Sequence, residues 1–144
     1  MWLALQLGTW GRAHGARVYG SGLKYGVEAD RGRMPDVTVF LAGRKPPGRG
    51  VVASPPDLAI EVVSPTPKDA RRDRVEKPGD YAAFGVRWYW LVDPALRTLE
   101  VFELRDGTYA RAGVASTGPV SEIPGCPGLV LDLDALWTEV DELG

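Results

Sequence analysis

Residues 56–67, PDLAIEVVSPTP, decide how the rest of the chain is interpreted. Positions 58–63 are almost entirely apolar, which is typical of a strand that is buried on both faces of a sheet. Thr66 and Pro67 supply a capping side chain and a proline at the first helical position, so the sequence predicts that a helix begins there. Glu61 is the single charged residue of the strand. A buried charge is costly unless it is paired or bound to a metal ion, so Glu61 requires a partner.

Strands are predicted on both sides of this stretch. Residues 36–41 alternate between apolar and polar, and residues 88–92 (WYWLV) give the strongest strand signal in the chain. Residues 98–104 and 108–112 are expected to form a hairpin around positions 106–107, an Asp-Gly pair that favours tight turns. Shorter strands are expected at 18–19, 23–27 and 129–131, and a loop rich in proline and glycine at 44–50.

Helices are predicted before, between and after these strands. Apolar residues at helical spacing define a first helix over 2–14, whose buried face would hold Leu3, Leu5, Leu7 and Trp10. A second helix is expected from about Lys68 to Glu76. Pro78 and Gly79 should interrupt it, because proline disfavours helical geometry at the residue before it, and a short helix follows at 81–84. The last helix is expected at 133–143.

The predicted order α-β-β-β-α-β-β-β-α indicates an α/β fold with a central mixed β-sheet flanked by helices. All 144 residues fit one domain, residues 1–144. The 17 basic and 19 acidic residues give a net charge of −2, which excludes a basic coat over the whole surface. No apolar run approaches the ~20 residues of a membrane span, and no basic segment precedes the apolar start, so a cytoplasmic protein without a membrane segment is expected.

Several classes of site are excluded by counting residues. One cysteine, Cys126, excludes an internal disulfide and a multi-cysteine zinc site, and one histidine, His14, makes a Ser-His-Asp triad improbable. The glycine-rich stretches match neither a dinucleotide fingerprint nor a phosphate loop. Cys126 is interpreted as an incidental thiol in a loop, and the aromatic residues at 88–90 as core.

After these exclusions, the candidate site residues that remain are carboxylates. Asp36 opens one predicted strand and Glu61 lies late in another, so their side chains converge at one sheet edge if the two strands are neighbours. Two such carboxylates suit a hard cation such as Mg²⁺, which takes phosphate oxygens and waters as its other ligands. The alternative, which we leave open here, is that Asp36 caps a turn and Glu61 pairs with a buried arginine.

Four blocks of the sequence follow a known pattern in order and spacing. They are residues 34–39 (MPDVTV), residues 56–66 (PDLAIEVVSPT), the spacing Lys77-x-x-x-Tyr81 and residues 85–94 (GVRWYWLVDP). Over residues 15–112 the chain resembles the Uma-type restriction endonuclease family of the PD-(D/E)XK nuclease-like superfamily. The resemblance implies a restriction-endonuclease-like core of a helix, a three-stranded meander, a helix and a strand. It also implies an endonuclease, a phosphodiesterase that depends on Mg²⁺ or Mn²⁺.

The resemblance assigns roles residue by residue. Asp36 matches the aspartate of the first half-motif and Glu61 the acid of the second, with the backbone carbonyl of Val62 as a further metal ligand. The lysine that usually follows two residues after the acid is absent, because that position is Val63. Lys77, from the following helix, corresponds to the lysine of this family, and its alternative interpretation is a solvated cation at a helix end.

The resulting hypothesis is a Mg²⁺- or Mn²⁺-dependent endonuclease that hydrolyses nucleic acid, with DNA as the expected substrate. Asp36, Glu61 and Lys77 would be catalytic, and nonspecific phosphate contacts would come from Arg71, Arg72 and Arg74. A homodimer would supply the two centres that cutting both strands requires. The alternative is an inactive nuclease-fold module that binds nucleic acid or a protein, marked by Trp88 or Trp90 if exposed. Relatives carry a hairpin before the first helix, so a shortened N-terminus is also expected.

Overall fold

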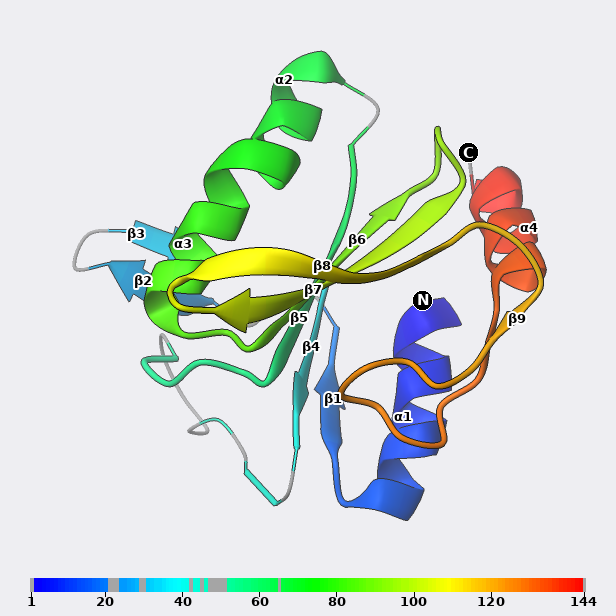
Figure 1. Cartoon of the computed structure of the whole chain (residues 1–144), viewed down its shortest axis with the longest axis horizontal. Helices are drawn as coiled ribbons and strands as arrows, with labels where there is room; N and C mark the ends of the chain where they lie inside the picture. The colour runs from blue at the N-terminus through cyan, green and yellow to red at the C-terminus, as the bar shows by residue number, and fades with distance from the viewer. Residues whose placement is uncertain are drawn as a thin grey trace.

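A computed structural model of the chain describes residues 2–20, 24–28, 31–41, 43–44, 46, 52–64 and 66–143. Within these residues, six strands form one central sheet in the order β1-β4-β5-β6-β7-β8 (Figure 1). The strands are β1 (Arg17–Tyr19), β4 (Val37–Phe40), β5 (Leu58–Val62), β6 (Trp88–Asp93), β7 (Thr98–Arg105) and β8 (Thr108–Ala115). Strands β5 and β6 are parallel, and the other neighbours are antiparallel. The mixed α/β sheet and the three-stranded meander β1-β4-β5 are as predicted.

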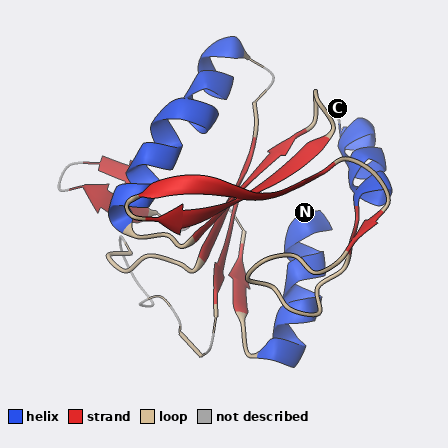
Figure 2. Cartoon of the chain, in the orientation of Figure 1, coloured by secondary structure: helices blue, strands red, loops and turns tan. Residues whose placement is uncertain are grey.

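Helices cover both faces of the sheet (Figure 2). One face carries α1 (Trp2–His14), α4 (Leu133–Leu143) and the small pair β9 (Pro119–Val120) and β10 (Leu131–Asp132). The other face carries α2 (Pro67–Arg71), η1 (Arg72–Glu76), α3 (Lys77–Phe84) and the hairpin of β2 (Tyr25–Glu28) and β3 (Arg31–Arg33). None of the helices within the described residues has the length and hydropathy that crossing a bilayer would need.

The pleat of β6 separates the two hydrophobic cores. Trp88 and Trp90 pack with α1 and α4, whereas Tyr89 and Leu91 pack under α3. All four side chains are buried, as expected for core residues. Because Trp88 and Trp90 are not exposed, they do not form the partner surface that the alternative hypothesis required.

Residues 67–84 remain helical throughout, so the predicted interruption at Pro78 is wrong. A proline in a helix clashes with the carbonyl four residues earlier and removes one hydrogen bond. Here a π-helical turn, η1, directly precedes it, and the Lys77 N–H donates to the carbonyl of Arg72, five residues earlier. The wider turn places Pro78 near the start of α3, where a missing N–H is tolerated.

The remaining differences from the predicted elements are local. Leu5 is 68% exposed, because α1 directs only the stripe of Leu3, Leu7 and Trp10 into the core. The short strands β3 and β9 were not predicted, and the strand expected at 129–131 is found at Leu131–Asp132. Residue 23 of one expected strand and residues 45 and 47–50 of the expected loop lie outside the described residues.

The loop between β9 and β10 packs on the sheet through Gly125. This glycine has a φ of +83°, and a Cβ built on it would lie 2.6 Å from Nε1 of Trp88. Gly118 also has a positive φ, +68°, but a Cβ there would meet nothing within 4 Å. The two glycines therefore share the backbone constraint and differ in the space around them.

We expect Gly125→Ala to lower the free energy of unfolding more than Gly118→Ala does. The left-handed backbone alone costs an alanine roughly 1–2 kcal/mol, and overpacking against Trp88 adds roughly 1–3 kcal/mol. Urea unfolding of both variants measures the difference directly. Equal losses in the two variants would show that the loop moves away from Trp88 at no cost.

Candidate active site

The pairing of β4 with β5 brings the two predicted carboxylates to one end of the sheet. Val37 is the register partner of Ile60, so Asp36, just before β4, lies beside the end of β5. Its Oδ2 accepts a hydrogen bond of 2.7 Å from the N–H of Val62. Because the N–H and C=O of a strand residue point to the same side, the Val62 carbonyl also faces the β4 side.

Glu61 is buried under the helix, with 2% of its side chain exposed. Its two oxygens have different partners: Oε1 accepts a hydrogen bond of 2.7 Å from the hydroxyl of Tyr81, and Oε2 lies 3.1 Å from Nζ of Lys77. Glu61 was expected to require a partner. The structure gives it a lysine and a tyrosine, and not the buried arginine of the alternative interpretation. Lys77 and Tyr81 stand four residues apart, which puts both side chains on one face of α3.

Burial raises the pKa of Glu61 from its ordinary value to about 7, and the neighbouring Asp36 charge acts in the same direction. Lys77 and the Tyr81 hydroxyl oppose this rise, because both stabilise the ionised carboxylate. Burial and the adjacent Glu61 charge also raise the pKa of Tyr81, so its hydroxyl remains a donor at neutral pH. A carboxyl group whose pKa lies near neutrality is typical of functional sites.

The position that usually carries the lysine is Val63, which is buried in the core beneath α3. Lys77 instead approaches Glu61 from the first turn of α3, directly after the π-helical turn. With 18% of its side chain exposed, Lys77 is not the solvated helix-end cation of the alternative interpretation. π-Helical turns occur frequently at functional sites, and this one sets the start of the helix that presents Lys77.

A pocket of about 250 Å³ opens at this point, and we call it the carboxylate pocket. It is lined by Met34, Asp36, Glu61, Val62, Ser64, Asp69, Arg72 and Lys77. Its described side chains include three carboxyl groups and two cations, so the pocket carries one net negative charge when all three carboxyl groups are ionised. The second oxygen of Asp36, Oδ1, accepts no hydrogen bond from any residue that the structure describes.

The donor set fits a divalent cation of the hard type. Asp36 and Glu61 offer carboxylate oxygens and Val62 a carbonyl, and Mg²⁺ characteristically takes one or two protein carboxylates with waters and phosphate oxygens. The described residues contain no cluster of three or more His, Cys, Asp or Glu side chains that would form an all-protein metal cage. A cation held by Asp36, Glu61 and the Val62 carbonyl would complete its coordination with waters or phosphate oxygens.

Comparison with protein families decides where the chain belongs. The model of the Uma2 family, described as "Putative restriction endonuclease", matches residues 1–134. The chain belongs to the Uma2 family. Asp36, Glu61, Val62 and Lys77 all lie within the matched residues.

A solved structure with a similar fold supports this placement. The crystal structure of a "putative nuclease" from Anabaena variabilis ATCC 29413 matches with a TM-score of 0.69. The match covers 94% of this chain and 76% of that chain at 20% sequence identity, so it establishes a shared nuclease-like fold. Among functionally curated proteins, none matches this Uma2 member.

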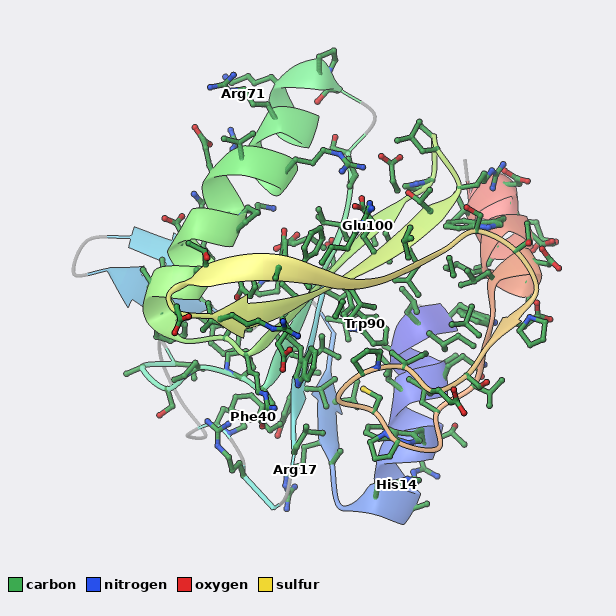
Figure 3. All side chains as sticks on the ribbon, viewed as in Figure 1. His14, Arg17, Phe40, Arg71, Trp90 and Glu100 are labelled. Atoms are coloured by element: carbon green, nitrogen blue, oxygen red, sulfur yellow. The ribbon has the colours of Figure 1, made fainter. Side chains whose placement is uncertain are left out.

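The three predicted phosphate-binding arginines lie in different places. Arg72 lines the carboxylate pocket, within 3.6 Å of Asp69 and 3.8 Å of Glu76. Arg71 is exposed on the outer side of α2 and points away from the sheet (Figure 3). Arg74 faces the sheet outside this pocket, so the structure does not bring the three arginines together. Their role in binding nucleic acid stays a prediction.

Tyr81 is a site residue to which the sequence analysis assigned no role. The family spacing Lys77-x-x-x-Tyr81 contains it, and the i, i+4 separation was the signal that both side chains share a helix face. A second residue that anchors the helix is Asp80, whose Oδ2 lies 2.6 Å from the guanidinium of Arg33 in β3. Both contacts hold α3 in the position that presents Lys77 to Glu61.

Arg74 ties the π-helical turn to strands β6 and β7 through two ion pairs. Its guanidinium lies 2.5 Å from Asp93 Oδ2 and 3.1 Å from Glu100 Oε1. Burial acts to raise the pKa of Asp93, but hydrogen bonds from Arg74 and from the N–H groups of Leu96 and Ala95 outweigh it, so the pKa lies below its ordinary value. A carboxyl group with a lowered pKa stabilises the folded state above its unfolded pKa and loses that contribution as the pH falls.

We therefore expect Asp93→Asn to destabilise the protein at pH 7 by roughly 1–3 kcal/mol, because it removes a charged hydrogen bond from a buried pair. The difference between the two proteins should shrink as the pH falls below about 4, where the wild-type carboxyl group itself becomes protonated. Urea unfolding of both proteins across that pH range measures it. A difference that stays constant with pH would contradict the assigned ion pair.

Proposed function

We propose that this Uma2 protein is a nuclease that hydrolyses phosphodiester bonds with the help of Mg²⁺ or Mn²⁺, with DNA as the substrate. The observation that carries the proposal is the convergence of Asp36, Glu61 and Lys77 on one pocket from three separate segments. Burying such polar groups lowers stability unless each has a hydrogen-bond or ionic partner. Here all three line a pocket that can admit a phosphate.

Asp36, Glu61 and the carbonyl of Val62 would hold the cation. When bound, such a cation lowers the pKa of a water molecule and neutralises the phosphate charge. The N–H of Val62 donates to Oδ2 of Asp36, and this hydrogen bond sets the orientation of the whole carboxylate, including its other oxygen, Oδ1. Tyr81 orients Glu61 in a comparable way, because its hydroxyl donates to one carboxylate oxygen.

Lys77 has two roles in this proposal. In the absence of substrate it balances the buried charge of Glu61 at 3.1 Å. With a phosphodiester in the carboxylate pocket, its ammonium group stabilises the negative charge that develops on the phosphate oxygens. Arg72, at the same pocket, provides a contact for a neighbouring phosphate, and exposed Arg71 a more distant one.

The alternative of an inactive nuclease-fold module has lost one of its supports, the interrupted helix, and the partner surface that exposed tryptophans would have marked. Its interrupted helix is continuous in the structure, and Trp88 and Trp90 are buried. The substitution of lysine by Val63 remains, but Lys77 supplies a cation to the same carboxylate. The acidic balance of residues 57–144, with 9 basic and 16 acidic residues, still favours the inactive module, so the cleavage assay has to separate the two functions.

The first test is cleavage of supercoiled plasmid in Mg²⁺ and in Mn²⁺. We expect the wild type to cut, Glu61→Gln to be inactive and Lys77→Met to lose roughly 100-fold or more in rate, as when a group that stabilises transition-state charge is removed. Glutamine keeps the shape of Glu61 and an acceptor for Tyr81, so the fold is retained. The matched controls are Glu103→Gln and Lys24→Met, because both residues lie outside the carboxylate pocket.

Undiminished cleavage by Glu61→Gln would refute the proposed centre, and so would equal losses in the control variants. The product also tests the homodimer that cutting a duplex suggests: two paired centres linearise the plasmid, whereas one centre leaves it nicked. Sedimentation at the assay concentration gives the oligomeric state independently of activity.

The second test is metal binding, measured by titrating Mn²⁺ into the wild type and Asp36→Asn in a calorimeter. We expect roughly micromolar to millimolar affinity for the wild type, and a loss of about tenfold or more in the variant, because one charged ligand is removed. Asparagine still accepts the hydrogen bond from Val62, so the strand end is preserved.

The control variant for metal binding is Asp57→Asn, whose carboxylate accepts the N–H of Leu41 away from the carboxylate pocket. Its affinity for Mn²⁺ should equal that of the wild type. Binding that survives unchanged in Asp36→Asn would place the cation elsewhere in the protein and contradict the assigned ligands.

A further inference from the structure

A second pocket, of about 420 Å³, is lined by residues of α3 and of the β7–β8 hairpin. Figure 1 shows where this helix and this hairpin lie. We call this second pocket the aromatic pocket. Its volume lies within the range of small-molecule sites, and its walls are mostly apolar, as such sites are. The proposed chemistry of the carboxylate pocket makes no use of it.

The sheet side of the aromatic pocket consists of aromatic rings. Phe102 and Tyr109 are half-buried and are the rings that a ligand can reach, and the fully buried Tyr89 supports them, with its ring centroid 5.6 Å from that of Tyr109 and 6.4 Å from that of Phe102. The Tyr89 and Tyr109 rings are inclined by 28°, so their faces are roughly aligned. The helix side is formed by Gly79, Ala82 and Ala83, which have little or no side chain. An aromatic wall opposite small residues suits a flat ligand.

The charges at the rim of the aromatic pocket are balanced. Arg74 is paired with Asp93 and Glu100, and Arg111 lies 3.6 Å from Glu100. Two cations face two carboxylates, so the rim offers no excess positive charge for a phosphate. Besides the hydroxyls of Tyr89 and Tyr109, the polar side chains of the lining are Arg74 and Thr108, and they suit the polar edge of a neutral ring.

The two pockets adjoin through neighbouring residues. Lys77 lines the carboxylate pocket and the next residue, Pro78, lines the aromatic pocket. Glu61 lines the first and its register partner on β6, Leu91, lines the second. A polymer that crosses the helix could therefore present a phosphate to one pocket and a ring to the other.

We propose that the aromatic pocket binds an unpaired nucleobase of the strand whose phosphate occupies the carboxylate pocket. The inference rests on the proposed nuclease function for that phosphate. Bases stack on aromatic side chains with little regard to sequence, since every base has a flat face. A paired base inside a duplex cannot enter a pocket, so the site selects single-stranded or extruded nucleotides.

Equilibrium binding in EDTA tests the proposal without metal or cleavage. The probe is a fluorescein-labelled single-stranded oligonucleotide, compared with a fully abasic strand of equal length and charge. We expect the strand with bases to bind about tenfold more tightly, as when one base stacks. Ala82→Leu fills the pocket without loss of helix propensity and should remove that preference. Val75→Leu, at an exposed position of η1 outside the pocket, should keep it.

Equal binding of the two strands by the wild type would overturn the proposal, because it would show that phosphate contacts suffice. An unchanged preference in Ala82→Leu would overturn it as well. A measurement on the wild type alone avoids any dependence on variant folding: titration with adenosine should shift the amide NMR signals of Gly79, Ala82 and Gly107, and unmoved signals would contradict the site. Failure of cleavage with base binding intact would count against the nuclease proposal alone.

Discussion

The burial of one carboxylate organises this molecule. Glu61 sits in an otherwise apolar strand at the centre of the sheet, where an unpaired charge would be prohibitively costly. The helix above it compensates for the lost hydration of the carboxylate, because Lys77 and Tyr81 each contact a different oxygen of Glu61. Asp36, drawn to the same strand end by the N–H of Val62, adds a second negative charge next to the first. Two like charges side by side disfavour each other's ionised form, and this is the reason that we propose a cation at the site.

The helix satisfies this constraint by being fastened on three sides. Lys77 and Tyr81 hold it to β5, Arg74 to the ends of β6 and β7, and Asp80 to the β2–β3 hairpin. A regular α-helix with proline at position 78 would be kinked at this place. The π-helical turn absorbs the proline and rotates the residues before it relative to those after it. Arg74 and Lys77 can then reach separate targets on either side of one helix.

The six strands of the central sheet, the cap at Thr66 and the convergence of Asp36 and Glu61 could be predicted from sequence, because each depends on local pattern or on a single conspicuous residue. Lys77 required the family resemblance, since nothing in its neighbours indicates that it faces inward. The continuous helix could not be predicted, because the π-helical turn is a tertiary solution to a local conflict at Pro78. The separate positions of Arg72 and Arg74 depend on the same turn, and Leu5 faces solvent because α1 buries only a narrow stripe.

The parallel pairing of β5 with β6 has a wider consequence. Parallel neighbours cannot be joined by a tight turn, so the chain must leave one end of the sheet and return to the other through a long crossover. In this protein that crossover is the helix that carries Lys77. Such crossovers are usually α-helices, so this topology commonly places a helix across the strand that carries the acid. In this chain the cation that faces Glu61 comes from the crossover helix and not from the strand, where position 63 is valine, so a crossover can supply a cation to a carboxylate on the strand that it covers.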